Sequence, residues 1–276
     1  MKNLTGERMP RLTRTIRKIA LTLGIYNLYE KLLESEVLSA DKKPSHVAVI
    51  LDGNRRWARE EGLPLEEGYK EGARRVEDFL KWCYDAGIKT VTLYALSTEN
   101  IHRRSQEELQ VLLGILREYL KREHERGELI KRKVRVKALG FLDLLPSDIV
   151  KELRELEDRT KEFRERFLNV AIAYGGRAEI VEAAKRIAKD VLNRDISIDD
   201  IDEKTFEKYL LTAHLPNPYP DLVIRTSGES RISNFLLWQI AYSELVFLDV
   251  YWPEFRKIDF YRALRTYQKR SRRYGA

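Results

Sequence analysis

The fold is decided by the stretch His46-Val47-Ala48-Val49-Ile50-Leu51-Asp52-Gly53-Asn54-Arg55-Arg56-Trp57. Its first half is a continuous apolar run, which is typical of a strand buried on both faces of a parallel sheet. Its second half is a turn sequence with two arginines that leads into a helix. A strand that ends this way predicts an α/β sheet with polar groups at one edge.

The same alternation continues to the end of the chain. Apolar runs alternate with segments of helical spacing, and no internal repeat or linker interrupts them. We therefore predict one α/β domain with a central, mostly parallel six-stranded sheet covered by helices on both faces. The other expected strands are Thr90–Leu96, Val134–Leu139, Leu168–Tyr174, Asp221–Arg225 and Leu245–Val250, and the main expected helices are Glu66–Ala86, Gln106–Glu125, Ser147–Arg166 and Ala178–Leu192.

Composition excludes several classes of protein. The 276 residues are 43% hydrophobic and 34% charged, which argues against a disordered chain, and a single cysteine, Cys83, rules out an internal disulfide. The formal charge of +7 permits an anionic partner without choosing one. Because no apolar stretch is long enough for a membrane span and no signal peptide is evident, we expect a cytoplasmic protein.

The beginning of the chain differs from the rest. Between Arg11 and Leu33, apolar residues at helical spacing accompany a cluster of basic residues, so we expect residues 1–43 to form a basic amphipathic helical extension. Residues 44–276 would then form the catalytic domain. Two interpretations of the extension stay open: a helix docked on its own domain, or a peripheral contact of residues 1–40 with the inner membrane surface.

Polar clusters follow the expected strands. In open α/β sheets the ligand site lies beyond the carboxyl ends of the strands, so these clusters are expected to converge. The glycine, hydroxyl and arginine groups in these clusters are of the kinds that bind phosphate oxygens. An acid such as Asp52 would be unfavourable beside phosphate unless a Mg²⁺ ion lies between Asp52 and a diphosphate. One such cluster alone is more often a simple turn or helix cap, and it is the repetition that favours a site. The clusters are 52–57, 97–100 with Arg103, 175–177 and 225–234.

The sequences of these clusters and of the strands before them resemble those of a known family. The opening stretch is similar to the first signature of the cis-prenyltransferases, the undecaprenyl diphosphate synthase family. The resemblance runs in one order from about His46 to the C-terminus and includes the stretches 92–100, 173–177 and 221–244. It implies the archaeal type of polyprenyl diphosphate synthase, with an apolar tunnel lined by helical faces such as Phe79–Trp82 and Leu109–Leu120, although ordinary core is an equal alternative for each face.

The resemblance implies a transferase that adds isopentenyl diphosphate repeatedly to farnesyl or geranylgeranyl diphosphate with cis double bonds. The product would be a long-chain polyprenyl diphosphate, the precursor of a glycosyl carrier lipid. Asp52 would be the catalytic carboxylate and a ligand of Mg²⁺, and Glu244 would be the second metal position. Asn100 matches a residue assigned to proton removal. Since an amide is a very weak base, we expect it to orient the substrate or a water instead.

The resemblance also implies a homodimer, in which a tail such as Arg273-Tyr274-Gly275 reaches the neighbouring site. Arg225, Arg231 and Ser233 match the isopentenyl diphosphate site, and residues 53–56 match the cradle of the allylic diphosphate. The full set of expected substrate-binding residues is Gly53, Asn54, Arg55, Arg56, Trp57, Tyr69, Ser97, Thr98, Glu99, Arg103, Arg225, Arg231, Ile232, Ser233, Arg273 and Gly275.

Three positions depart from the family pattern around the allylic diphosphate. Tyr69 stands where the family usually has histidine, Leu65 where an arginine is common, and Ile101 where an aromatic residue often follows the Ser-x-Glu-Asn motif. These departures put the detailed contacts with the allylic substrate in question.

Two other functions are alternatives to this one. A nucleic-acid-binding module without catalysis would use the basic run Lys131–Arg135, but that run leads into a strand and lacks interleaved aromatic residues. A synthase of short cis-prenyl chains is a further alternative. The acidic segment 199–203 resembles the motif of the all-helical trans-prenyltransferases, but it occurs once in a polar stretch, and we interpret it as a helix cap on the surface.

Overall fold

The structure is a computed structural model, and it describes residues 25–270. Its six strands are β1 (His46–Ile50), β2 (Thr90–Ser97), β3 (Val134–Leu139), β4 (Arg166–Tyr174), β5 (Leu222–Arg225) and β6 (Glu244–Phe247). The helices are α2 (Ile25–Ser39), α3 (Asn54–Glu61), α4 (Leu65–Asp85), α5 (Thr98–Arg103), α6 (Gln106–Arg126), α7 (Glu128–Lys131), α8 (Ser147–Thr160), α9 (Gly176–Leu192), α10 (Glu203–Glu207) and α11 (Lys257–Lys269). Single 3₁₀ turns lie at Leu142–Leu144, Ile198–Asp200 and Trp252–Glu254.

The six strands form one sheet in the order β3-β4-β2-β1-β5-β6, and every pairing is parallel. The predicted α/β sheet is thus confirmed. Ile50, near the end of β1, pairs with Tyr94 on one side and Arg225 on the other. This register places the residues that follow β1, β2 and β5 at the same edge.

Each central strand is buried on both faces because alternate side chains enter two separate cores. Val47 and Val49 belong to the larger core, and Ala48 and Ile50 belong to the smaller one. This arrangement explains why β1 is a continuous apolar run and not an alternating one.

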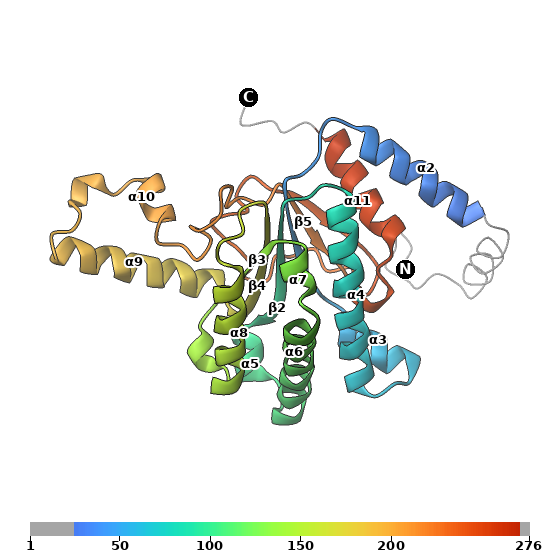
Figure 1. The fold of residues 1–276 in the computed structure, drawn as a ribbon, viewed down its shortest axis with the longest axis horizontal. Coiled ribbons are helices and arrows are strands. Elements are labelled where there is room, and N and C mark those ends of the chain that lie inside the picture. Colours follow the sequence, from blue (N-terminus) through green and yellow to red (C-terminus); the bar gives the residue numbers. More distant parts are fainter. Residues whose placement is uncertain (1–24, 271–276) are drawn as a thin grey trace.

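The larger core is covered by helices α4, α6, α8, α11 and α2 (Figure 1). Phe79 of α4 is fully buried there against the rings of Trp252, Phe255 and Phe260 at centroid distances of 5.6, 6.1 and 5.5 Å. Of the two interpretations of Phe79, this packing supports ordinary core. Leu109, Leu112 and Leu116 of α6 are only partly buried, so the expected apolar tunnel stays a prediction for that face.

The smaller core lies on the other face of the sheet and is closed mainly by the segment between β5 and β6. Phe235 and Leu236 of that segment are fully buried, and Phe235 stacks on Tyr94 at 4.5 Å between ring centroids. The segment that closes this core is the same one that follows β5 at the polar edge.

The largest differences from the predicted element boundaries lie at the ends of α8 and β6. The helix expected to reach Arg166 ends at Thr160, whose buried hydroxyl accepts from the Val136 amide and donates to the Leu156 carbonyl. The last expected strand begins at Glu244 and ends at Phe247, because the chain then turns toward Ser227 and Gly228. Neither change moves the polar edge of the sheet.

Helix α2 packs on the domain. Its Leu33 and Val37 are 1% exposed in the larger core, and Glu34 forms an ion pair with Lys257 of α11 at 2.6 Å. For residues 25–39 the docked interpretation is therefore correct, while Leu28 and Leu32 stay 62% and 61% exposed on the outer side. Residues 1–24, which carry most of the predicted basic cluster, lie outside the described part of the chain.

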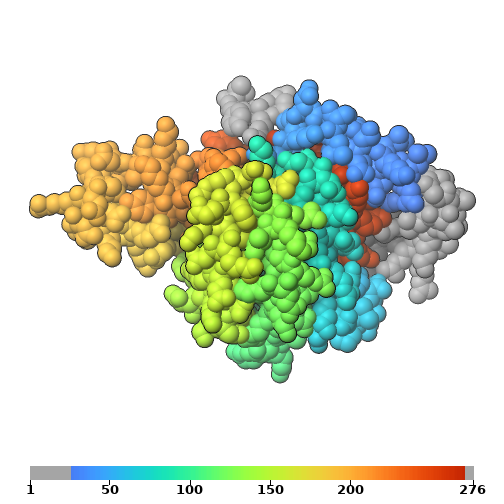
Figure 2. Space-filling model, in the orientation of Figure 1, coloured from blue at the N-terminus to red at the C-terminus, as the bar shows by residue number. Residues whose placement is uncertain are grey.

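Helices α9 and α10 extend from the body as an arm, which is plain in the ribbon and in the space-filling view (Figures 1 and 2). Among residues 25–270, no helix combines the length and the apolar character that crossing a membrane requires.

Candidate active site

The turn after β1 requires glycine at position 53. Gly53 caps α3 with φ +108°, and a Cβ there would lie 2.6 Å from Cδ1 of the Tyr251 ring. Both the backbone angle and the missing space exclude a side chain. The turn directs Asp52 toward the loop after β5 and leaves the first amide groups of α3 at the edge of the sheet, where an anion is favoured.

Asp52 is held by two arginines. Its Oδ2 accepts from Arg225 Nη2 at 2.8 Å, and its Oδ1 accepts from Arg56 Nη2 at 3.2 Å. Burial alone would raise the pKa of Asp52, but the hydrogen bond from Arg225 and the charge of Arg56 outweigh it and lower that pKa. Asp52 is therefore an anion at neutral pH, and 28% of its side chain reaches solvent.

Arg225 connects two parts of the site. Its side chain is 5% exposed, and besides Asp52 it donates to Ser233 Oγ at 2.6 Å and to the carbonyl of Arg231. The loop that supplies these partners is strained, since Ser227, Ser233 and Asn234 have φ of +77°, +48° and +63°. Left-handed conformations of residues other than glycine concentrate at functional sites.

Arg56 and Arg231 share one carboxylate. Glu229 accepts from Arg56 at 3.1 Å and from Arg231 at 2.6 Å, and Arg56 also donates to Ser227 Oγ at 2.6 Å. Arg231 is 64% exposed, so its guanidinium is accessible to a ligand. The structure thus brings together Asp52, Arg56, Arg225, Arg231 and Ser233, as the sequence predicted.

The segment after β2 is connected to the same loop. Asn234 donates from Nδ2 to Glu99 Oε1 at 2.7 Å and accepts from the Arg177 amide at 2.8 Å. Ser97 caps α5 by accepting from the Asn100 amide at 3.1 Å, and Thr98 donates to Glu99 at 3.3 Å. Three of the predicted strand-end clusters therefore meet through Asn234.

Some residues that were predicted to bind substrate have side chains that contact the protein itself or are only partly buried. The Asn54 side chain donates to the Leu51 carbonyl at 3.2 Å and lies against Gly72, so its amide faces the protein. Trp57 and Ile232 are partly buried, and Arg55 and Arg103 are exposed. Tyr69 is 7% exposed, and its hydroxyl is already engaged by Glu108 at 2.5 Å and Arg104 at 2.8 Å.

Within one chain, the structure does not place Glu244 beside Asp52. Glu244 is the first residue of β6 and pairs with Leu222, the first residue of β5, so it lies at the opposite edge of the sheet. There it accepts from Arg270 at 3.0 Å. The sequence contained this information, because a residue that precedes a parallel strand lies across the sheet from residues that follow one. Arg273 and Gly275 lie outside the described residues.

Several residues of the predicted cluster 225–234 organise the site, although the sequence assigned them no individual role. Thr226 donates to the Asp52 carbonyl at 2.7 Å and accepts from the Asp52 amide at 3.1 Å, which fixes the backbone of the turn after β1. Ser227 and Glu229 hold Arg56, and Asn234 joins the clusters. All four lie within nine residues of the end of β5, and their position after a strand was the available signal.

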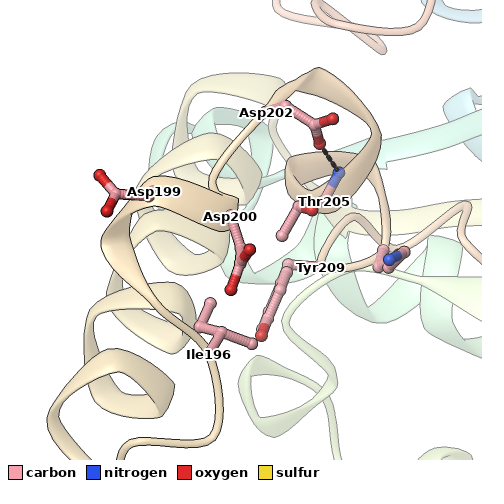
Figure 3. Close-up of a pocket in the computed structure, with 7 residues that line it drawn as sticks. Ile196, Asp199, Asp200, Asp202, Thr205 and Tyr209 are labelled. Carbon is pink, nitrogen blue, oxygen red and sulfur yellow. Dashed lines mark hydrogen bonds between the residues drawn. The ribbon is translucent and has the colours of Figure 1, made fainter.

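A surface pocket of about 570 Å³ lies elsewhere, on the arm (Figure 3). Ser197 and Asp200 cap the 3₁₀ turn reciprocally, and Asp202 accepts from the Thr205 amide at 2.7 Å to start α10. This geometry agrees with the interpretation of the acidic segment 199–203 as helix caps. Its carboxylates stay separate from the arginines around Asp52.

Comparison with known proteins shows which family the chain belongs to. The Prenyltransf family model, described as undecaprenyl diphosphate synthase, matches residues 50–275. A relative from Methanopyrus kandleri, named tritrans,polycis-undecaprenyl-diphosphate synthase (geranylgeranyl-diphosphate specific), is 50% identical over 100% of both chains. One of the same name from Pyrococcus horikoshii is 48% identical over 91% of this chain and 93% of its own.

A solved structure extends the agreement to the fold. The lavandulyl diphosphate synthase of Lavandula x intermedia, in complex with dimethylallyl diphosphate, matches with a TM-score of 0.81 and 36% identity. The match covers 85% of this chain and 99% of that one. The resemblance noted in the sequence thus holds over the whole described fold, and the chain belongs to the undecaprenyl diphosphate synthase family of prenyltransferases, the enzymes that make polyprenyl diphosphates.

Proposed function

We propose that the chain condenses isopentenyl diphosphate repeatedly onto geranylgeranyl diphosphate, forms cis double bonds, and releases a polyprenyl diphosphate of undecaprenyl length. The names of the relatives at 48–50% identity support this primer and product. The single observation in the structure that supports it most is the ion-paired cluster of Asp52, Arg56 and Arg225 at the carboxyl edge of a parallel sheet.

The arginines of the site are of the kind that stabilises a departing diphosphate. Loss of an allylic diphosphate concentrates negative charge on its oxygens, and pre-positioned guanidinium groups stabilise that charge. We assign the amides at the start of α3, with Arg55 and Arg56, to the allylic diphosphate. We assign Arg225, Arg231 and Ser233 to isopentenyl diphosphate. Arg225 contacts both Asp52 and Ser233, so it aligns the two substrates with each other.

The donor set at Asp52 fits a magnesium ion. Mg²⁺ is commonly bound by one or two carboxylates together with substrate phosphates, and Asp52 offers an ionised, partly exposed carboxylate beside a proposed diphosphate site. When bound, Mg²⁺ would neutralise charge on the departing diphosphate. Glu244 is not available to the same site from within this chain, so Asp52 is the proposed protein ligand.

Asn100 lies partly buried on α5, one residue after Glu99, whose carboxylate is fixed by Asn234. We propose that Asn100 orients the substrate or a water, and that diphosphate oxygen accepts the proton lost in each condensation. An amide has no useful basicity near neutral pH.

Replacement of Asp52 tests the assignment. Asp52→Asn keeps the shape of the side chain but removes the charge that pairs with both arginines, and we expect kcat to fall about a thousandfold. Radiolabelled isopentenyl diphosphate incorporation measures this. Asp199→Asn, on the exposed arm, is the matched control and should keep wild-type activity. Activity of Asp52→Asn within a few-fold of wild type would contradict the catalytic role.

The metal proposal has its own measurement. Titration of the substrate-loaded enzyme with excess EDTA should abolish condensation, and added Mg²⁺ should restore it. Undiminished product in chelator would defeat the proposal. Direct calorimetry of Mg²⁺ binding with geranylgeranyl thiolodiphosphate present should show weaker binding by Asp52→Asn than by the wild type.

Primer and product length are tested together. The enzyme is incubated with isopentenyl diphosphate and, in turn, dimethylallyl, farnesyl and geranylgeranyl diphosphate, and the products are sized. We expect geranylgeranyl diphosphate to give the highest kcat/KM and long chains. Exclusive use of dimethylallyl diphosphate with short products would favour the short-chain alternative, which the similarity to lavandulyl diphosphate synthase keeps relevant.

We also propose that the enzyme is a homodimer whose product serves as a glycosyl carrier lipid. The protruding arm supports self-association, since it exposes Val181 at 54% and Leu192 at 84%. Sedimentation equilibrium should give about twice the chain mass of 32.5 kDa. A monomer that turns over normally would contradict the dimer, and failure of the purified product to accept sugar phosphate in a membrane extract would contradict the carrier role.

A further inference from the structure

We propose that Glu108, held by Tyr69 and Arg104, is a positioning residue that orients Arg55 for the allylic diphosphate. This inference rests on the assignment of Arg55 to the allylic diphosphate made above. It gives a task to Tyr69, the residue that departs from the family pattern, and to two residues that no motif singled out.

The four side chains come from separate elements. Arg55 lies in the first turn of α3, Tyr69 in α4, and Glu108 in the first turn of α6, while Arg104 caps the C-terminal end of α5. Ser105 fixes the start of α6 by accepting from the Glu108 amide at 3.2 Å. The cluster therefore connects four helix ends.

The contacts centre on one buried carboxylate. Glu108 is 7% exposed, and its Oε1 accepts from the Tyr69 hydroxyl at 2.5 Å and forms an ion pair with Arg104 Nη1 at 3.2 Å. Arg104 also donates to the Tyr69 oxygen at 2.8 Å, and its guanidinium lies 5.6 Å from the centre of the Tyr69 ring. These two hydrogen bonds and one ion pair restrain Oε1 of Glu108.

The other oxygen of Glu108 faces Arg55. Oε2 lies 3.4 Å from Arg55 Nη1, while the Arg55 side chain is 61% exposed. This is a loose contact that a stronger anion displaces readily. An exposed arginine loses rotamer entropy when it is immobilised, so a carboxylate that already restrains it lowers the entropic cost of binding a diphosphate.

Charge balance explains why a tyrosine suits position 69. Arg55, Arg104 and Glu108 sum to one positive charge, and burial raises the pKa of Tyr69, so its hydroxyl stays neutral. Tyr69 can then donate to Glu108 and accept from Arg104 at once without changing that balance. Phenylalanine would lose both bonds, and a cationic side chain would compete with Arg104 for the carboxylate.

The effect of Glu108 has two opposing parts. Its charge disfavours a diphosphate nearby, while its hold on Arg55 favours one. Glu108→Gln removes both parts, and the proposal requires that the loss of positioning outweighs the relief of repulsion. In an Arg55→Ala background only the repulsion remains, so the same substitution should then leave binding unchanged or tighten it.

The experiment is a double-mutant cycle. The dissociation constant of geranylgeranyl thiolodiphosphate, an unreactive analogue, is measured by calorimetry for wild type, Glu108→Gln, Arg55→Ala and the double variant. We expect Glu108→Gln to weaken binding about fivefold in the wild-type background and to give no loss in the Arg55→Ala background. Tyr69→Phe, which changes no charge, should weaken binding in the same direction.

Controls separate positioning from folding. Glu107→Gln, on the exposed side of the same helical turn, should match wild type, and KM for isopentenyl diphosphate should be unchanged in every variant. Equal losses from Glu108→Gln in both backgrounds, or tighter binding in the wild-type background, would overturn the positioning role. If Arg55→Ala binds the analogue as wild type does, the assignment of Arg55 itself fails, which is a different result.

Discussion

At the scale of single residues, the site depends on one backbone conformation. Gly53 places Asp52 and the start of α3 where the arginines can meet the carboxylate, and Thr226 secures the same turn through its two bonds to the Asp52 backbone.

We expect Gly53→Ala to destabilise the fold by about 2–4 kcal/mol, because it adds a left-handed alanine and a clash with Tyr251. Gly62→Ala is the matched control. Gly62 also has a positive φ of +68°, but nothing lies within 4 Å of its added Cβ, so only about 1 kcal/mol is expected. Urea denaturation measures both, and equal losses would show that the contact with Tyr251 costs nothing.

Residue roles were predictable where a strand end fixed them. Asp52 and Arg225 follow paired strands, so the parallel register alone brings them together. Glu108 and Arg104 were not predictable, because their partner Tyr69 lies on another helix and helix packing sets that meeting. Glu244 was assigned to the metal from the resemblance alone, and within the chain the parallel register places it at the opposite edge of the sheet from Asp52.

At the scale of secondary-structure elements, a chain of buried polar groups crosses three strands. His46 of β1 lies 2.8 Å from the Thr92 hydroxyl of β2, Asn169 of β4 donates to that hydroxyl at 3.0 Å, and His214 lies 3.0 Å from Asn169. Burial lowers the pKa of His46 to about 4 and that of His214 to about 4. Both histidines are therefore neutral in the folded protein.

The two buried, neutral histidines predict that the folded protein loses stability in mild acid. The unfolded histidines take up protons near pH 6.5 and the folded ones near 4, so stability is present above 6.5 and falls as the pH falls toward 4. Between pH 7 and 5 the loss is about 2 kcal/mol for each histidine. Urea denaturation at several pH values should show a smaller slope for His214→Asn than for wild type.

His102→Asn, on exposed α5, is the control and should keep the wild-type slope. An unchanged slope in His214→Asn would mean that other groups cause the acid sensitivity.

The ends of an element could be predicted where a change of residue type in the local sequence marks them. Strand β3 was predicted at both ends, because the basic run Lys131–Lys133 precedes it and Gly140 follows it. The end of α8 was not, since Thr160 stops the helix through a bond to β3, a contact between elements.

At the scale of the whole molecule, the larger core extends to α2. The buried Leu33 and Val37 show that residues 25–39 are part of the folded body, so a boundary at residue 43 would cut through shared core. A test of membrane contact should therefore remove only residues 1–24, which carry Arg8, Arg11, Arg14, Arg17 and Lys18.

We expect deletion of residues 1–24 to weaken association with vesicles of anionic phospholipid at least tenfold and to change kcat less than twofold. The physical reason is the loss of basic charge, worth about 1 kcal/mol for each residue near such a surface. Vesicle co-sedimentation at two salt concentrations measures it. A variant with those five basic residues changed to glutamine should behave like the deletion, and unchanged association in either would refute a basic membrane contact.

The shared guanidinium of Arg225 has a consequence for kinetics. Because the buried guanidinium contacts both the Asp52 carboxylate and the Ser233 hydroxyl, the two proposed substrate sites share one cation and are not independent. We therefore expect occupation of one proposed site to change the electrostatic potential at the other, which substrate synergism in the kinetics would reveal.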